Sequence, residues 1–74
     1  MSKYPMIFRI KTPDGDGEAR KEKSSEPWSV NYPSGSLRWF GTSRSMQKCA
    51  TERIRIDSDY TRDIEIAFTE EGGA

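Results

Sequence analysis

Apolar and polar residues alternate near the start of the chain, in YPMIFRIKT (residues 4–12). Tyr4, Met6, Phe8 and Ile10 fall on one face of an extended chain, because successive side chains of a strand point to opposite sides. A period of two is typical of a half-buried β-strand. The pattern therefore predicts a first strand over residues 4–12.

The same alternation occurs on both sides of a turn in WSVNYPSGSLRWFGT. Trp28, Val30 and Tyr32 alternate before the turn residues PSGS, and Leu37 and Trp39 resume the alternation after them. Proline, serine and glycine each favour a tight change of direction. Two alternating runs around such a turn predict a β-hairpin.

A helical period follows this hairpin. Thr42 or Ser43 can cap a first helical turn through a side-chain hydroxyl. Apolar residues then recur at steps of three, one and four and share one helical face; these residues are Met46, Cys49, Ala50 and Ile54. The spacing predicts one short helix.

The segment RIRIDSDYTRDIEIAF, residues 53–68, allows two interpretations. In the first, the helix ends near Arg53 and a second hairpin follows. In the second, the helix takes in Ile54 and only residues 63–69 form a strand. Both agree with the spacing of the isoleucines, so the pattern alone leaves them open.

Two segments lack the apolar residues that would offset the entropy of ordering. Residues 13–27 combine glycine, proline and charge without a large apolar side chain, which predicts a mobile loop. Residues 70–74 predict a frayed tail. The chain of 74 residues is expected to be a single small domain over residues 1–74. Its predicted class is α+β, a small antiparallel sheet of about four strands with one short helix packed on one face.

The composition indicates a thin core in a chain without net charge. Hydrophobic residues make up 32%, and 12 acidic side chains balance 12 basic ones. Because a second copy would cover apolar surface that a small core leaves open, we expect a homodimer. The single cysteine excludes an internal disulfide and indicates a reducing compartment, by default the cytoplasm. The opening MSKYPMIFRI is too short and polar for a membrane span or signal peptide.

Charge is segregated along the chain. Residues 1–12 carry a net charge of +3, residues 13–27 carry −2, residues 28–55 carry +4 and residues 56–74 carry −5. A basic middle and an acidic end can each steer a partner of opposite charge. The alternative interpretation is that these two segments pair with each other across adjacent strands.

Catalysis is the function class that the composition argues against most strongly. The chain has no histidine, so neither a Ser-His nor a Cys-His nucleophile can be assembled. Asp57, Asp59, Asp63 and Glu65 could gather around a divalent cation, but such a site needs a rigid cavity that a short chain rarely builds. We expect solvated turn carboxylates instead, and therefore no enzyme, no cofactor and no metal site.

Two further metal motifs fail on their spacing. DGDGE resembles the start of a calcium loop, but counting from Asp14 the required glycine at position six is Ala19 and the required glutamate at position twelve is Ser25. Cys49 has neither a second thiol nor a histidine with which to bind zinc. We interpret it as a small core residue of the helix.

The chemistry that remains is that of a contact surface around SGSLRWFGTSRSMQK. Strand alternation places Trp39 and Phe40 on opposite faces, so one ring needs cover outside the first core layer. Aromatic and arginine side chains dominate the energetics of interfaces. The predicted partner-binding residues are Arg38, Trp39, Phe40, Arg44 and Lys48, with the acidic Asp57, Asp59, Asp63 and Glu65.

Two function classes can use these residues. The first is a small non-enzymatic protein-binding module, for example an inhibitor of the phage-encoded anti-defence or anti-CRISPR type, whose acidic end occludes a basic nucleic-acid-binding groove of another protein. The second is a single-stranded nucleic-acid-binding domain, in which bases stack on Trp28, Tyr32, Trp39 or Phe40. The cations that would follow the phosphates are Arg38, Arg44, Lys48, Arg53 and Arg55. The isoelectric point near 6.2 weighs against the second class, because such domains are usually basic.

Overall fold

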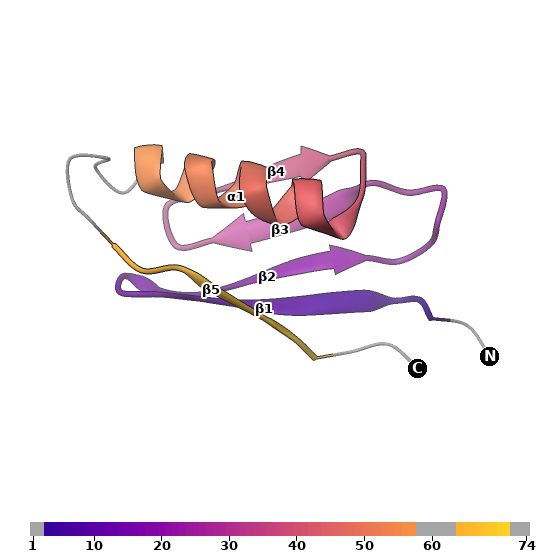
Figure 1. The fold of residues 1–74 in the computed structure, drawn as a ribbon, viewed down its shortest axis with the longest axis horizontal. Helices are drawn as coiled ribbons and strands as arrows, with labels where there is room; N and C mark the ends of the chain where they lie inside the picture. Colours follow the sequence, from indigo (N-terminus) through magenta and orange to yellow (C-terminus); the bar gives the residue numbers. More distant parts are fainter. Residues whose placement is uncertain (1–2, 58–63, 72–74) are drawn as a thin grey trace.

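The computed structural model describes residues 3–57 and 64–71. In these ranges the chain forms five strands and one helix (Figure 1). The elements are β1 (Met6–Thr12), β2 (Gly15–Lys21), β3 (Trp28–Tyr32), β4 (Gly35–Trp39), α1 (Ser43–Asp57) and β5 (Ala67–Glu70). This confirms the α+β class with one 15-residue helix and adds a strand to the four that were expected.

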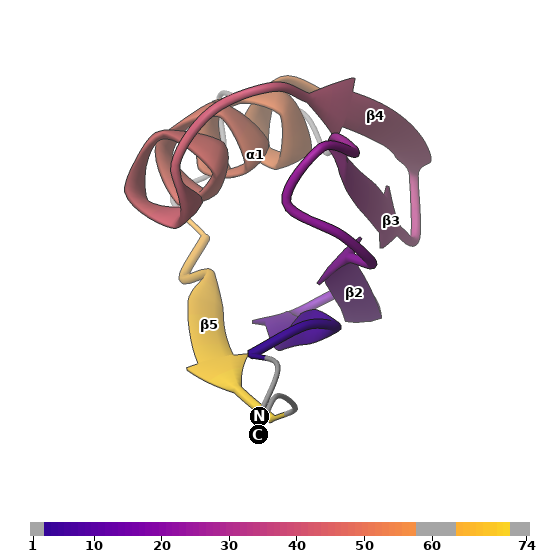
Figure 2. The ribbon, with the colours of Figure 1, turned by 90° about the vertical axis from the view of Figure 1, so that its right-hand side faces the viewer.

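The strands form one antiparallel sheet in the order β4-β3-β2-β1-β5. The first four strands follow one another as a meander, and α1 then carries the chain from the β4 edge to the opposite edge, where β5 pairs with β1. The helix contacts β4 and β3. Figure 2 shows the sheet curling from β4 round to β5, with α1 on the inner side of the curve.

The core lies between the inner face of the sheet and α1. Its buried apolar residues are Phe8, Ile10, Ala19, Trp28, Val30, Tyr32, Met46, Ala50, Ile54 and Ile64. The alternation in β1 and β3 and the apolar face of the helix are therefore confirmed. Cys49 is only partly buried. Each large apolar side chain that is fully buried contributes about 1.5–3 kcal/mol.

The prediction of a mobile loop over residues 13–27 is wrong for Gly15–Lys21, which form β2. This strand has hydrogen-bonded neighbours on both sides, β1 and β3. Its order therefore comes from main-chain pairing more than from side chains of its own. The turn before it is also fixed, because Thr12 Oγ1 accepts a 3.1 Å hydrogen bond from the Asp14 N–H and donates a 2.7 Å bond to the Gly15 carbonyl.

Small residues in β2 make room for large rings from its neighbours. Ala19 is fully buried and pairs with Phe8 on one side and Val30 on the other. The rings of Phe8 and Trp28, from β1 and β3, approach to 5.7 Å between centroids. A larger side chain at position 19 would occupy the same part of the core. The strand thus lacks the apolar signal that sequence patterns rely on.

The second interpretation of residues 53–68 is confirmed for the helix, but its strand over residues 63–69 is placed too early, because β5 spans Ala67–Glu70. The helix takes in Ile54 and continues to Asp57, and a single strand follows at β5. The predicted frayed tail begins too early, because Glu70 belongs to β5 and the Glu71 N–H donates a 2.8 Å hydrogen bond to the Ile7 carbonyl. Residues 72–74 of that prediction lie outside the described residues.

Candidate functional site

The most exposed large apolar side chain of the described residues lies at the junction between β4 and α1. Phe40 directly follows β4 and is 75% exposed. The next large apolar residue in exposure is Ile56, at 56% near the end of the helix. If another molecule covered this ring, a large apolar area would be removed from water, which favours binding.

Residues on both sides of Phe40 make hydrogen bonds to the first turn of α1. The Trp39 Nε1–H donates to Ser45 Oγ over 2.9 Å. Thr42 caps the helix, since its Oγ1 accepts from the Ser45 N–H over 3.1 Å and its carbonyl accepts from the Met46 N–H over 2.9 Å. The exposed ring therefore sits on a rigid junction.

Gly41 completes this junction. Its φ is +157°, and an added Cβ would lie 2.8 Å from Ser45 Oγ and 2.8 Å from Trp39 Nε1. These are the two atoms of the hydrogen bond that ties β4 to α1. Only glycine fits between them without displacing that bond.

The structure separates the predicted basic and aromatic residues. Arg38 pairs with Ser29, on the outer face of the sheet, whereas Trp39 lies on the inner face and packs against the core. Phe40 lies beyond the strand end. Phe40 directly precedes the junction with the helix and Arg44 lies in the first turn of α1, and we call these two residues the Phe40 surface.

The solvent-facing side of α1 is basic. Arg44, Lys48 and Arg55 follow spacings of four and seven residues, which place them on one helical face, and all three are exposed. In the described parts of the chain, no carboxylate forms an ion pair with them. Arg44 and Lys48 of this face were predicted as contacts of a protein partner, and Arg55 was predicted only as a contact of nucleic-acid phosphates.

The predicted acidic residues have different fates. Asp57 lies at the end of α1, where its Oδ2 accepts a 2.6 Å hydrogen bond from the hydroxyl of Tyr32. Glu65 is exposed. Asp59 and Asp63 lie outside the described residues. One predicted acid therefore has a structural role within the fold.

The pKa of Tyr32 is raised above its ordinary value, mainly by burial. Burial raises the pKa of the Tyr32 hydroxyl, and the hydrogen bond to Asp57 raises it further, while Arg53 lowers it. The neutral hydroxyl is thus the form that the fold favours. Tyr32 and Trp28 are 7% and 1% exposed, so neither ring is available to stack on a ligand.

Ion pairs at the sheet surface connect the first strand to its neighbours. Arg9 lies 3.6 Å from Asp16 of β2 and 3.2 Å from Glu71 beyond β5. Arg20 and Glu22 form a further pair. All these side chains are exposed, so solvent screens the pairs and they contribute little to stability. Through its contact with Glu71, Arg9 of β1 neutralises part of the negative charge at the acidic end of the chain.

Sequence reasoning missed a groove between α1 and β5. It has a volume of about 480 Å³. Its lining is formed by residues of the helix and of the segment around β5, which are Gln47, Lys48, Thr51, Glu52, Arg55, Ile66 and Phe68. The apolar alternation of residues 64–68 indicated a strand, but it carried no information on which neighbours that strand would have.

Across residues 3–57 and 64–71, no three metal-ligating side chains come together. No helix in that part of the chain is long and apolar enough to span a bilayer. Cys49 is a free, partly buried thiol.

Comparisons of the chain with protein-family models, curated proteins and solved structures find no match.

Proposed function

We propose that this chain is a small non-enzymatic protein-binding module and that the Phe40 surface is the centre of its contact area. The observation that carries the proposal is the 75% exposure of Phe40 on a hydrogen-bonded junction. Burying such a ring against a partner contributes about 1.5–3 kcal/mol. Because its backbone is already ordered, binding requires little further loss of conformational entropy.

The charge around Phe40 indicates the character of the partner surface. Arg44 lies four residues along the chain in the first helical turn, and Lys48 lies one turn further on the same face. A partner that buries Phe40 in an apolar pocket and presents carboxylates at the rim would be complementary to it. Occlusion of that partner's own binding site would make the module an inhibitor.

The proposal is tested by affinity capture from a lysate of the source organism, with wild-type protein and two matched variants. Phe40→Ala removes the ring of the Phe40 surface. Ile56→Ala removes an exposed apolar side chain elsewhere on the molecule. We expect the captured proteins to be lost with Phe40→Ala and kept with Ile56→Ala, and direct titration of a captured protein should show at least about a tenfold weakening for Phe40→Ala.

Capture of the same proteins by wild type and by Phe40→Ala would contradict the proposal. Both variants change exposed side chains, so each should unfold within about 0.5 kcal/mol of wild type in urea. That measurement separates a lost contact from a lost fold.

Single-stranded nucleic acid is the second candidate, supported by the basic face of Arg44, Lys48 and Arg55. It is weakened by the burial of Trp28 and Tyr32, which leaves Phe40 as the exposed ring among the stacking candidates. Titration with an oligothymidylate over a salt series tests it. Affinity that falls steeply with salt, and is lost in Phe40→Ala and Lys48→Ala, would place nucleic acid ahead of a protein partner.

A further inference from the structure

The outer edge of β5 carries main-chain groups directed away from the sheet. The Glu71 N–H donates to the Ile7 carbonyl of β1. In an antiparallel pair, successive residues alternate between bonding the neighbour and pointing away from it. Thr69 and Ala67 therefore face β1, and the N–H and C=O groups of Phe68 and Glu70 face the opposite side. Among the described strands none lies beyond β5.

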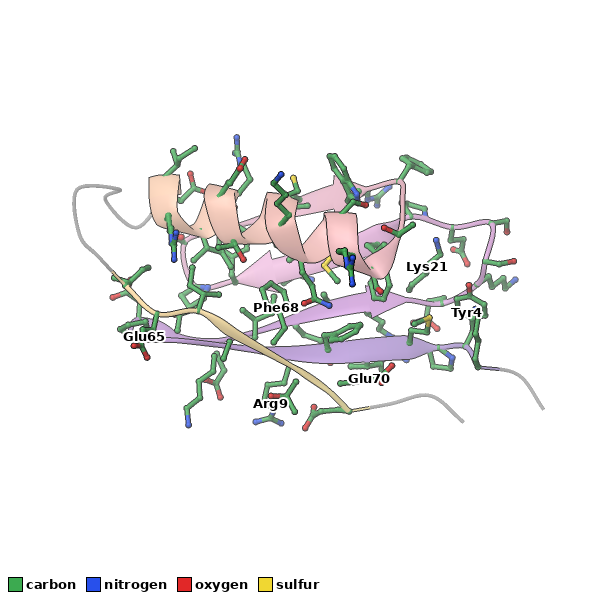
Figure 3. All side chains as sticks on the ribbon, viewed as in Figure 1. Tyr4, Arg9, Lys21, Glu65, Phe68 and Glu70 are labelled. Carbon is green, nitrogen blue, oxygen red and sulfur yellow. The ribbon has the colours of Figure 1, made fainter. Side chains whose placement is uncertain are left out.

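This edge opens onto the groove between α1 and β5. Ile66 and Phe68 form its apolar side, and the helix contributes the cations of Lys48 and Arg55 and one carboxylate, that of Glu52. Both apolar residues are only partly buried although they pack against the core. Figure 3 shows Phe68 on the side of β5 toward α1, with Arg9 on the opposite side of the sheet. An extended chain laid along β5 would cover this apolar surface.

We propose that the occupant of this edge is β5 of a second copy of the chain, paired antiparallel about a twofold axis. Phe68 and Glu70 of one copy would exchange main-chain hydrogen bonds with Glu70 and Phe68 of the other. This register places the two copies of Thr69 opposite each other, a favourable cross-strand pair. A register centred on Glu70 would instead oppose two like charges.

Charge complementarity favours a second copy as the occupant. Residues 64–71 carry three carboxylates and no cation, whereas α1 carries four cations and two carboxylates. Pairing of the two edges brings the acidic strand of each copy toward the basic helix of the other. The interface is self-complementary, as a twofold dimer requires, and it uses a surface other than the Phe40 surface.

The first experiment compares Glu70→Pro with Glu70→Ala by sedimentation equilibrium across a concentration series. Both variants remove the carboxylate, but only proline removes the outward N–H, which an edge strand tolerates within its own fold. We expect wild type and Glu70→Ala to approach twice the chain mass of 8.5 kDa at high micromolar concentration. Glu70→Pro should raise the dimer dissociation constant by at least about tenfold.

The second experiment uses charge exchange and does not depend on the proline variant folding. Lys48→Glu with Arg55→Glu makes the groove acidic, and Glu65→Lys with Glu70→Lys makes the strand basic. Each double variant alone should remain monomeric, because like charges then meet across the twofold axis. An equal mixture should form a heterodimer that sediments as the wild-type dimer does.

Three results would overturn the proposal. They are a wild-type protein that stays at 8.5 kDa at high micromolar concentration, a dimer that Glu70→Pro leaves unchanged, and a mixture of charge variants that stays monomeric. Phe40→Ala should dimerise like wild type, so failure of the dimer and failure of the proposed partner surface give different results.

Discussion

The hydroxyl of Tyr32 donates a 2.6 Å hydrogen bond to Oδ2 of Asp57, which ties the end of β3 to the last turn of α1. A carboxylate at a helix C-terminus is unfavourable toward the helix dipole, and this bond compensates for its position. We expect Tyr32→Phe to lower the free energy of unfolding by about 1–2 kcal/mol, since the acceptor is charged and partly exposed. Urea denaturation measures the change.

A control variant separates the effect of the hydrogen bond from the effect of the charge on Asp57. Asp57→Asn keeps an oxygen acceptor of the same shape, so it should lose less stability than Tyr32→Phe. An equal or larger loss in Asp57→Asn would mean that the charge of Asp57, and not its bond to Tyr32, stabilises the helix end.

The raised pKa of Tyr32 predicts a loss of stability in alkali. Burial is the main cause and the bond to Asp57 adds to it, so the folded state holds the phenolic proton more tightly than the unfolded state. That contribution is fully present below the unfolded pKa of about 10 and is lost as the pH rises through the folded pKa. Urea denaturation should be measured at intervals of about one pH unit from about pH 8 to about pH 11. The free energy of unfolding should fall more steeply with pH for wild type than for Tyr32→Phe. Parallel curves would contradict the assignment.

Gly41 should not tolerate a side chain. In Gly41→Ala the new Cβ would lie 2.8 Å from both Ser45 Oγ and Trp39 Nε1, so the Trp39–Ser45 bond must break or the junction must move. We expect a loss of about 1–3 kcal/mol in the free energy of unfolding. Gly35→Ala is the matched control, because its nearest contacts are 3.4 Å away, and it should change stability by less than about 0.5 kcal/mol.

Two isoleucines of the same helix should differ sharply on truncation. Ile54 is 1% exposed and Ile56 is 56% exposed. Ile54→Ala removes a buried side chain and leaves a cavity, which costs about 2–5 kcal/mol. Ile56→Ala should remain within about 0.5 kcal/mol of wild type. Similar losses for both variants would mean that the face of α1 that packs on the sheet is not the one described.

The two hairpins show what local patterns can and cannot predict. Both turn on a Pro-x-Gly sequence, at residues 13–15 and 33–35. The second was predicted, because large apolar residues alternate on both sides of it. The first was missed, because β2 has only the small Ala19 in the core, below rings that belong to β1 and β3. A strand whose neighbours fill its share of the core carries little hydrophobic signal.

The candidate surfaces were predictable to different degrees. Alternation predicted Trp39 and Phe40 on opposite faces of one strand, whereas β4 ends at Trp39 and Phe40 lies beyond it; the sequence could not show which ring the core would enclose. That depended on the bond between Trp39 and Ser45 across the junction. The edge position of β5 was beyond local reasoning, because its pairing with β1 joins the two ends of the chain.

The neighbour of the first strand is the last strand, and this order matters while the protein is being synthesised. A nascent chain that has emerged from the ribosome as far as α1 can already form the four-strand meander. The main-chain groups on one side of β1 then remain unpaired until residues 67–70 are synthesised and form β5. During that interval β1, which carries Phe8 and Ile10, is an unpaired edge strand that another chain could pair with. Rapid pairing with β5 protects the molecule from such aggregation.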